Sequence, residues 1–188
     1  RVSLLSIFVV AKNTYLMKHT AILPALGFAI LMAGAPLQQS YAANPILPMW
    51  EYIPDGEPYV FEDPDNPGKF RVYLYGSHDN LVTEYCGRDQ VVWSAPVDNL
   101  NEWRFDGVIF TSTRDANGNL LYANGQGDVL YAPDVAEVVD SKGKKTYYLY
   151  PNNQAWGRNG MVAKASRPDG PFVVCNWDPE NPKHTIGC

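Results

Sequence analysis

Two stretches of the sequence decide the fold: EPYVFEDPDNPGKFRVYLY at residues 57–75 and APDVAEVVDSKGKKTYYLY at residues 132–150. They align without gaps at an offset of 75 residues, and nine of the 19 aligned positions are identical. Each copy consists of an apolar stretch, a turn that contains glycine, and an aromatic stretch, which is the pattern of two strands joined in a hairpin. The chain therefore contains an internal repeat of β-hairpins.

Each hairpin is followed by two further apolar stretches, so each repeat supplies four candidate strands. The third stretches are residues 91–95 and 161–165, and the fourth lie near residues 103–105 and 172–174. Four antiparallel strands in each repeat are typical of the blades of a β-propeller. The sequence thus predicts an all-β fold with two propeller blades. The alternative is a β-sandwich in which two hairpins resemble each other by coincidence.

The composition supports this fold class and excludes several kinds of protein. The 188 residues include 15 Gly and 15 Pro, and 46% of them are hydrophobic, which suits a β protein rich in turns rather than a disordered chain. The net charge of −5 gives no basic surface on which a nucleic acid would bind. We therefore expect no nucleic-acid partner.

The N-terminal part of the chain has the character of a targeting segment. Met17-Lys18-His19 precedes an apolar run from Ala21 to Ala35, and Ser40-Tyr41-Ala42 supplies the small residues of a cleavage site. The run is shorter than the roughly 20 residues that a membrane-spanning helix needs. We expect a secreted or periplasmic protein without a membrane anchor after cleavage.

Three segments follow from this interpretation. Residues 1–16 are expected to be upstream sequence translated from a wrong start, and residues 17–42 to be the signal peptide. Residues 43–188 are expected to form the N-terminal part of a propeller domain.

The chain has three cysteines, Cys86, Cys175 and Cys188. In an oxidising compartment Cys86 can pair with Cys175 and leave Cys188 unpaired, and three free thiols are the open alternative. The spacing does not suit a zinc site, and no metal ligands are predicted.

Three acids are the candidate catalytic residues. Asp55 and Glu57 lie where the first strand of the first repeat is expected to begin, and the offset places Asp134 at the level of residue 59. Side chains two apart on a strand share a face, so acids from two blades would converge on one channel. Converging carboxylates in a sugar-sized pocket are the equipment of glycoside hydrolysis, as base, acid and pKa modulator. The alternative role of each acid is turn formation.

Five further residues are candidates for contact with a sugar. Aromatic rings can stack on the apolar C–H faces of sugars, although ordinary packing between blades is the alternative for each ring. The run Ser77-His78-Asp79 is not a catalytic triad, because adjacent strand residues point to opposite faces, but a histidine or aspartate there could still contact substrate. The candidates are Trp50, His78, Asp79, Tyr131 and Trp156.

Several motifs, taken together in order and spacing, resemble glycoside hydrolase family 43. They include Asn44-Pro45-Ile46-Leu47, Pro54-Asp55-Gly56-Glu57-Pro58, Val72–Asp79, Val92-Trp93-Ser94-Ala95 and Tyr131-Ala132-Pro133-Asp134, within residues 44–175. The resemblance implies a secreted five-bladed propeller that hydrolyses glycans containing arabinose or xylose, with inversion at the anomeric carbon. The chain would hold about the first two of the five blades.

The resemblance also implies the roles of the acids. Either Asp55 or Glu57 would be the base, with a slight preference for Asp55 because the family uses an aspartate, and Asp134 would be the pKa modulator. The general acid, a glutamate of the third blade, would lie beyond Cys188, so the chain alone is expected to hydrolyse nothing.

The family needs no cofactor, although a structural calcium is often bound by blades that this chain does not include. The expected partner is a polysaccharide or oligosaccharide. The competing function is a carbohydrate-binding propeller without catalysis, and a propeller that binds proteins is a third alternative that no specific feature supports.

Overall fold

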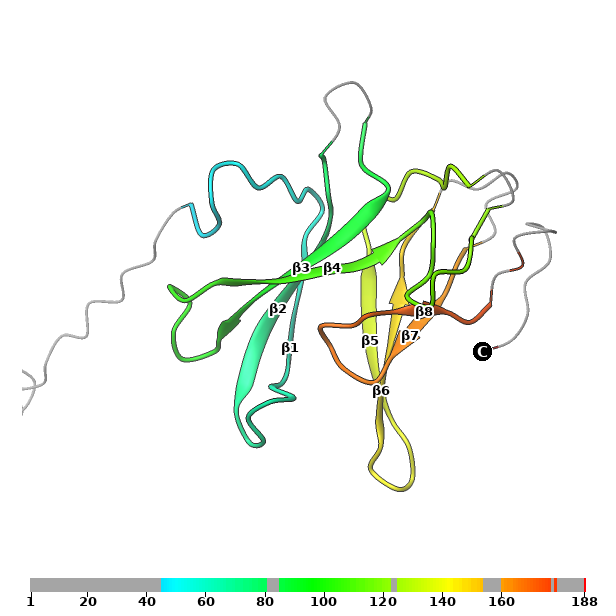
Figure 1. Ribbon diagram of the computed structural model, residues 1–188. Helices are drawn as coiled ribbons and strands as arrows, with labels where there is room; N and C mark the ends of the chain where they lie inside the picture. Colours follow the sequence, from blue (N-terminus) through cyan, green and yellow to red (C-terminus); the bar gives the residue numbers. More distant parts are fainter. Residues whose placement is uncertain (1–44, 81–84, 123–124, 154–159, 177, 179–187) are drawn as a thin grey trace, which may run out of the picture. The chain divides into compact units, whose positions relative to one another are not determined.

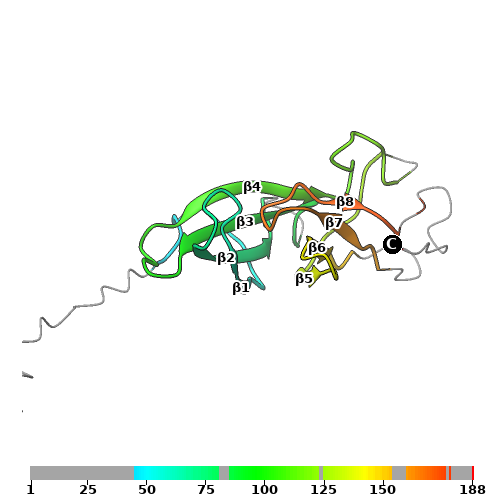
Figure 2. The same cartoon turned by 90° about the horizontal axis from the view of Figure 1, so that it is seen from below.

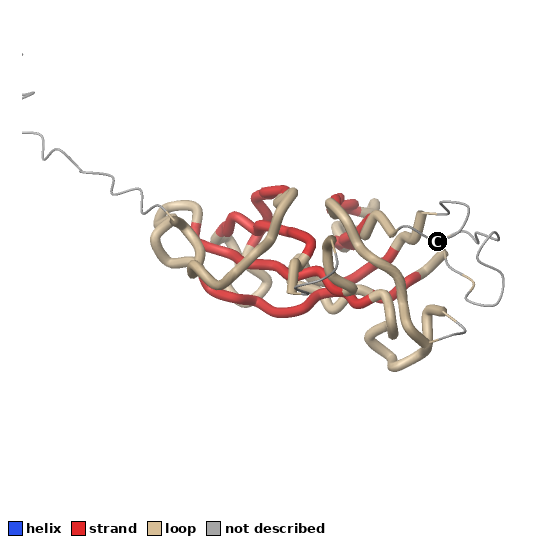
Figure 3. Tube along the Cα trace, turned by 90° about the horizontal axis from the view of Figure 1, so that it is seen from above, coloured by secondary structure: helices blue, strands red, loops and turns tan. Residues whose placement is uncertain are grey.

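The computed structural model describes residues 45–80, 85–122, 125–153, 160–176, 178 and 188. The expected signal peptide and upstream segment, and the candidate Trp156, lie outside the described residues. The described part consists of strands and loops (Figure 3), and no helix in it is long and apolar enough to cross a membrane. The predicted all-β class is confirmed for these residues.

The first repeat forms a four-stranded antiparallel sheet. Its strands are β1 (Glu57–Glu62), β2 (Phe70–Ser77), β3 (Asp89–Pro96) and β4 (Arg104–Thr111), and they neighbour one another in chain order (Figure 1). Each strand contains aromatic or β-branched residues, which fit the pleated surface of a sheet. This is the strand order predicted for one blade.

The second repeat forms a second sheet with the same order. Its strands are β5 (Asp134–Val139), β6 (Lys145–Tyr150), β7 (Ala163–Ala165) and β8 (Val173–Val174), again antiparallel and in chain order (Figures 1 and 2). Two four-stranded meanders in the described part of the chain confirm the prediction of two blades.

The alignment of the two repeats without gaps is wrong for their first strands. Tyr73 of β2 pairs with Tyr59, whereas its counterpart Tyr148 of β6 pairs with Ala136, so β1 and β5 correspond at an offset of 77 rather than 75. The cause is the hairpin loop, which spans residues 63–69 in the first sheet and only 140–144 in the second. The second loop closes with a backbone hydrogen bond of 3.0 Å from Asp140 N to Lys144 O.

The turn glycines nevertheless match across the repeats. Gly68 and Gly143 both have φ of +80°, a left-handed conformation that glycine adopts without a steric penalty. Both glycines lie close to the start of their second strand. The alignment at offset 75 is therefore correct from the turn glycine onward.

The two sheets share one hydrophobic core. Phe61 of β1 packs edge-on against Tyr147 of β6 with ring centroids 5.1 Å apart. The Tyr75 hydroxyl donates a hydrogen bond of 2.7 Å to the Pro168 carbonyl in the turn between β7 and β8. The buried core residues from both sheets are Phe61, Tyr73, Tyr75, Val92, Ile109, Phe110, Leu121, Leu130, Val135, Tyr147, Leu149, Met161, Ala163 and Phe172.

Ion pairs join the sheets at the edge of this core. Arg167 donates two hydrogen bonds, of 2.8 and 2.9 Å, to the carboxylate of Asp65, and it also contacts Asp169. The Lys145 ammonium lies 2.9 Å from Glu62. Bidentate contacts between arginine and carboxylate fix orientation as well as distance, so Arg167 sets how the two hairpin ends meet.

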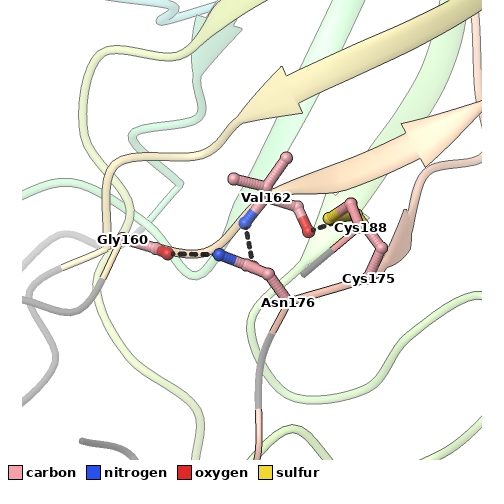
Figure 4. The surroundings of a disulfide bond; sticks show 5 residues. All are labelled: Gly160, Val162, Cys175, Asn176 and Cys188. Atoms are coloured by element: carbon pink, nitrogen blue, oxygen red, sulfur yellow. Dashed lines mark hydrogen bonds between the residues drawn. A yellow bond between two sulfur atoms is a disulfide. The ribbon is translucent and has the colours of Figure 1, made fainter. Parts of the chain in front are cut away.

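The cysteines pair differently from both sequence expectations. Cys175 forms a disulfide with Cys188, and Cys86 is free and buried. Figure 4 shows that the Asn176 side chain continues the pairing of the outer strands, by accepting from Val162 N and donating to Gly160 O. Cys86 is a buried residue of the connection between β2 and β3, and Cys175 directly follows β8, the outermost strand of the second sheet.

Candidate active site

Two of the predicted acids occupy the same position in their sheets. Glu57 is the first residue of β1 and pairs with Tyr75, and Asp134 is the first residue of β5 and pairs with Tyr150. The prediction that Asp134 corresponds to residue 59 is therefore wrong, because the shorter hairpin shifts β5 by two residues. A shift of two preserves which face the side chain occupies, so the acids still hold equivalent positions.

A tyrosine links the acids of the two sheets. The Tyr59 hydroxyl donates a hydrogen bond of 2.5 Å to Oδ1 of Asp134. The ring of Tyr59 stacks on Phe61 with centroids 5.7 Å apart, which holds the phenol in place. The hydrogen bond to Asp134, then burial, and then the negative charges of Asp134 and Glu57 raise the pKa of Tyr59 to about 12. Tyr59 therefore keeps its proton at neutral pH and donates it toward Asp134.

Tyr59 was not among the five residues predicted to contact a sugar. It lies two residues after Glu57 on the same face of β1, so strand alternation alone placed it beside that acid. Its contact with Asp134 depends on how the two sheets pack, which the alternation pattern does not contain.

Asp55 lies outside the strand in which it was expected. It is an exposed residue of the turn before β1, with φ of +54°, so strand alternation does not decide its direction. Non-glycine residues in this region of φ carry strain and are concentrated at functional sites. Its charge acts on the thiol of Cys86, which also interacts with Asp79. Burial, followed by these two carboxylates, raises the pKa of the Cys86 thiol.

His78 and Asp79 make separate contacts, as expected for neighbours at the end of a strand. Nδ1 of His78 lies 3.2 Å from Asp89, and Nε2 lies 3.5 Å from Glu51. Asp79 contacts Cys86 instead, and its buried Oδ1 lacks a hydrogen-bond partner. Asp79 and Asp55 therefore both interact with Cys86, while His78 contacts Glu51 and Asp89.

The aromatic candidate Trp50 lies apart from the candidate acids. Trp50 is 69% exposed and its ring lies 6.2 Å from that of Trp93. Trp93 pairs with Leu74, between Tyr73 and Tyr75, so it lies on the face of the first sheet opposite to those tyrosines and to Glu57. The structure therefore does not bring Trp50 together with the acids.

Tyr131 lies three residues before Asp134, and its ring centroid is 6.4 Å from that of Tyr85. Tyr85 is 79% exposed and was not among the predicted residues. A run of loop residues between two strands gave no periodic signal that could have identified it.

Two cavities lie beside the first sheet. One of about 370 Å³ is lined by residues of the β1–β2 and β3–β4 turns, including Asp63, Phe70 and Val97. The other, of about 260 Å³, lies beside Asp89 and Thr111. Neither is lined by the three predicted acids. Within the described ranges, no group of three or more His, Cys, Asp or Glu side chains is arranged to hold a metal ion.

One curated protein aligns with a large part of this chain. Over 109 residues the chain is 50% identical to a xylosidase/arabinosidase of Thermoclostridium stercorarium, which covers 57% of this chain and 20% of that protein. The chain therefore spans about a fifth of the length of this relative. No family model matches the sequence.

Solved structures with similar folds include three glycosidases. A GH43_1 enzyme of Xanthomonas citri complexed with xylotriose is 22% identical, with a TM-score of 0.43 over 71% of this chain and 33% of that one. RS223-β-xylosidase is 22% identical, with a TM-score of 0.41 over 67% and 36%. A family 43 arabinoxylan arabinofuranohydrolase of Bacillus subtilis is 23% identical, with a TM-score of 0.39 over 62% and 24%. The identity of 50% to a protein named xylosidase/arabinosidase confirms the predicted resemblance of this chain to a glycosidase, and two of the solved structures above are titled as family 43 enzymes.

Proposed function

We propose that the protein to which these two sheets belong is a glycosidase that hydrolyses O-glycosyl bonds of plant glycans containing arabinose or xylose. The observation that carries the proposal is the pair of acids at equivalent positions of two sheets, Glu57 and Asp134, of which Asp134 accepts a hydrogen bond from Tyr59 of the first sheet. The relative that is 50% identical is named for these two sugars, which supports the substrate class.

The proposed reaction is an inverting hydrolysis. One carboxylate removes a proton from water, which attacks the anomeric carbon while an acid protonates the departing glycosidic oxygen. Asp55 or Glu57 is the proposed base, and Asp134 is the proposed modulator that holds a negative charge near the acid. The general acid is proposed to come from residues outside the two sheets, and the 188-residue chain by itself is proposed to be inactive.

The protein is also proposed to act outside the cytoplasm after removal of its signal peptide, residues 17–42. N-terminal sequencing of the protein recovered from the periplasm or culture medium should begin at Ala43. A protein that keeps residues 17–42 would contradict this proposal.

The test of activity uses the 188-residue chain and the full product of its gene, assayed on aryl arabinofuranosides, aryl xylosides and arabinoxylan. We expect sugar release from the full product alone, with the anomeric configuration inverted when the product is followed by proton NMR. Replacing Asp134 by Asn, or the true base by its amide, should lower kcat by at least roughly 100-fold. Asp98→Asn, in the exposed β3–β4 turn, is the matched control and should keep full activity.

Three outcomes would change the proposal. If Asp55→Asn and Glu57→Gln both keep full activity, the assignment of the base is wrong. Sugar release by the isolated chain would show that its own residues complete the site. Binding of oligosaccharides by the full product without any hydrolysis would favour the carbohydrate-binding alternative.

A further inference from the structure

Two tyrosines from separate segments of the chain lie close together. Tyr85 lies between β2 and β3, and Tyr131 lies just before β5. Their ring centroids are 6.4 Å apart, and the ring planes are inclined at 43°. Tyr85 is 79% exposed, so the face of its ring is open to solvent. Together the rings form an angled aromatic surface, which we call the tyrosine platform.

The backbone on both sides of the platform is fixed by buried contacts. A Cβ atom at Gly87 would lie 2.0 Å from the carbonyl oxygen of His78, so this segment packs directly against the end of β2. The Gly87 carbonyl accepts a hydrogen bond of 3.0 Å from Leu130 N. Gln90, which is fully buried, donates a hydrogen bond of 2.9 Å to the Tyr131 carbonyl. These contacts tie the segment after Tyr85 to the segment that carries Tyr131.

The segments that carry the platform lead to candidate acids of both sheets. Cys86 follows Tyr85 directly, is buried, and interacts with the carboxylates of Asp79 and Asp55. Tyr131 precedes Asp134 by three residues. The segments that carry the two rings therefore continue directly into Cys86, whose thiol interacts with Asp79 and Asp55, and into β5, which begins at Asp134.

We propose that the tyrosine platform binds a pentose ring of the glycan, and that Tyr85 is a substrate-binding residue of this protein. Aromatic side chains provide a large, rigid contact surface at low cost in conformational entropy, and a phenol hydroxyl can bond to a sugar hydroxyl. The neighbouring carboxylates disfavour an anionic ligand and suit a neutral one. The choice of a pentose rests on the proposed function, whereas the aromatic contact rests on the geometry of the rings.

The test measures binding rather than hydrolysis, so it remains informative if the chain is inactive. Saturation-transfer NMR on the 188-residue chain reports which C–H groups of a ligand contact the protein, and the variants show which of these contacts depend on the Tyr85 ring. The probes are xylotriose and α-1,5-linked arabinotriose. The variants are Tyr85→Ala, Tyr85→Phe and, as matched control, Phe70→Ala. The control removes an exposed ring of β2 that is not part of the tyrosine platform.

We expect the wild-type chain and Phe70→Ala to show saturation transfer to the C–H faces of at least one trisaccharide. Tyr85→Ala should raise Kd by roughly tenfold, and Tyr85→Phe should keep most of the affinity because the ring remains. The inference is overturned if neither trisaccharide receives saturation, if Tyr85→Ala binds like wild type, or if Tyr85→Phe loses as much affinity as Tyr85→Ala. Loss of hydrolysis with intact binding would instead count against the proposed function.

Discussion

The hydrogen bond between Tyr59 and Asp134 leads to a prediction that does not depend on catalysis. With the carboxylate of Asp134 as acceptor, the pKa of Tyr59 is about 12 instead of the ordinary value of 10.0. A difference of two units corresponds to about 2.7 kcal/mol of preference for the protonated phenol. Because Tyr59 is partly exposed, solvent screens part of this, and we expect the contact to stabilise the fold by about 1.5 kcal/mol.

The pH dependence of this stabilisation follows from the direction of the pKa shift of Tyr59. The folded chain holds the Tyr59 proton more tightly than the unfolded chain does, so the stabilisation is fully present below pH 10. It is lost as the pH rises toward 12. Tyr59→Phe lacks this alkaline loss, because it has no proton to release and no hydrogen bond to lose.

The assay is an alkaline titration of the tyrosines by ultraviolet absorbance, in which the difference between wild type and Tyr59→Phe isolates Tyr59. Asp134→Asn removes the negative charge and should lower the pKa of Tyr59 toward 10, while Asp98→Asn should leave it unchanged. A double-mutant cycle of Tyr59→Phe and Asp134→Asn in urea should give a coupling energy of about 1.5 kcal/mol. A Tyr59 that titrates near 10 in wild type, or a coupling energy near zero, would refute the reasoning.

Three further predictions concern stability. Arg167→Ala should lower the urea midpoint at neutral pH, and the difference from wild type should vanish in acid. The reason is that the hydrogen bond from Arg167 lowers the pKa of Asp65, so the stabilisation is lost as the pH falls through that pKa. An unchanged midpoint at neutral pH would contradict this prediction. Gly87→Ala should destabilise the fold by about 3 kcal/mol through its clash with His78 O. Gly160→Ala, whose Cβ has no atom of the described residues within 4 Å, should have little effect in thermal denaturation. Equal effects of the two alanines would disprove this packing argument. Reducing the C-terminal disulfide, which spans 13 residues, should cost about 3 kcal/mol, and peptide mapping that finds a different pairing would refute the assignment.

Local residue patterns were sufficient to predict the fold class. Alternating aromatic and β-branched residues predicted the strands, and glycine turns such as those at Gly68 and Gly143 predicted the hairpins, because these signals act within a few residues of each other. The order of four strands in each repeat followed from the same pattern. The position of Glu57 at the start of β1 was likewise close to the expected one.

The site depended on features that act over long distances. Because the two hairpin loops differ by two residues, the residue of the first repeat that corresponds to Asp134 is Glu57 and not residue 59, and an alignment without gaps could not detect this. Packing of the two sheets, rather than any motif, brought Tyr59 to Asp134 and Tyr85 to Tyr131.

The disulfide was decided in the same way, since Cys175 pairs with Cys188 and leaves Cys86 free. The sequence by itself therefore determined the strands, their order and the candidate acids, because these depend on local residue patterns. The tertiary structure decided which side chains meet, because that depends on loop lengths and on the packing of one sheet against the other.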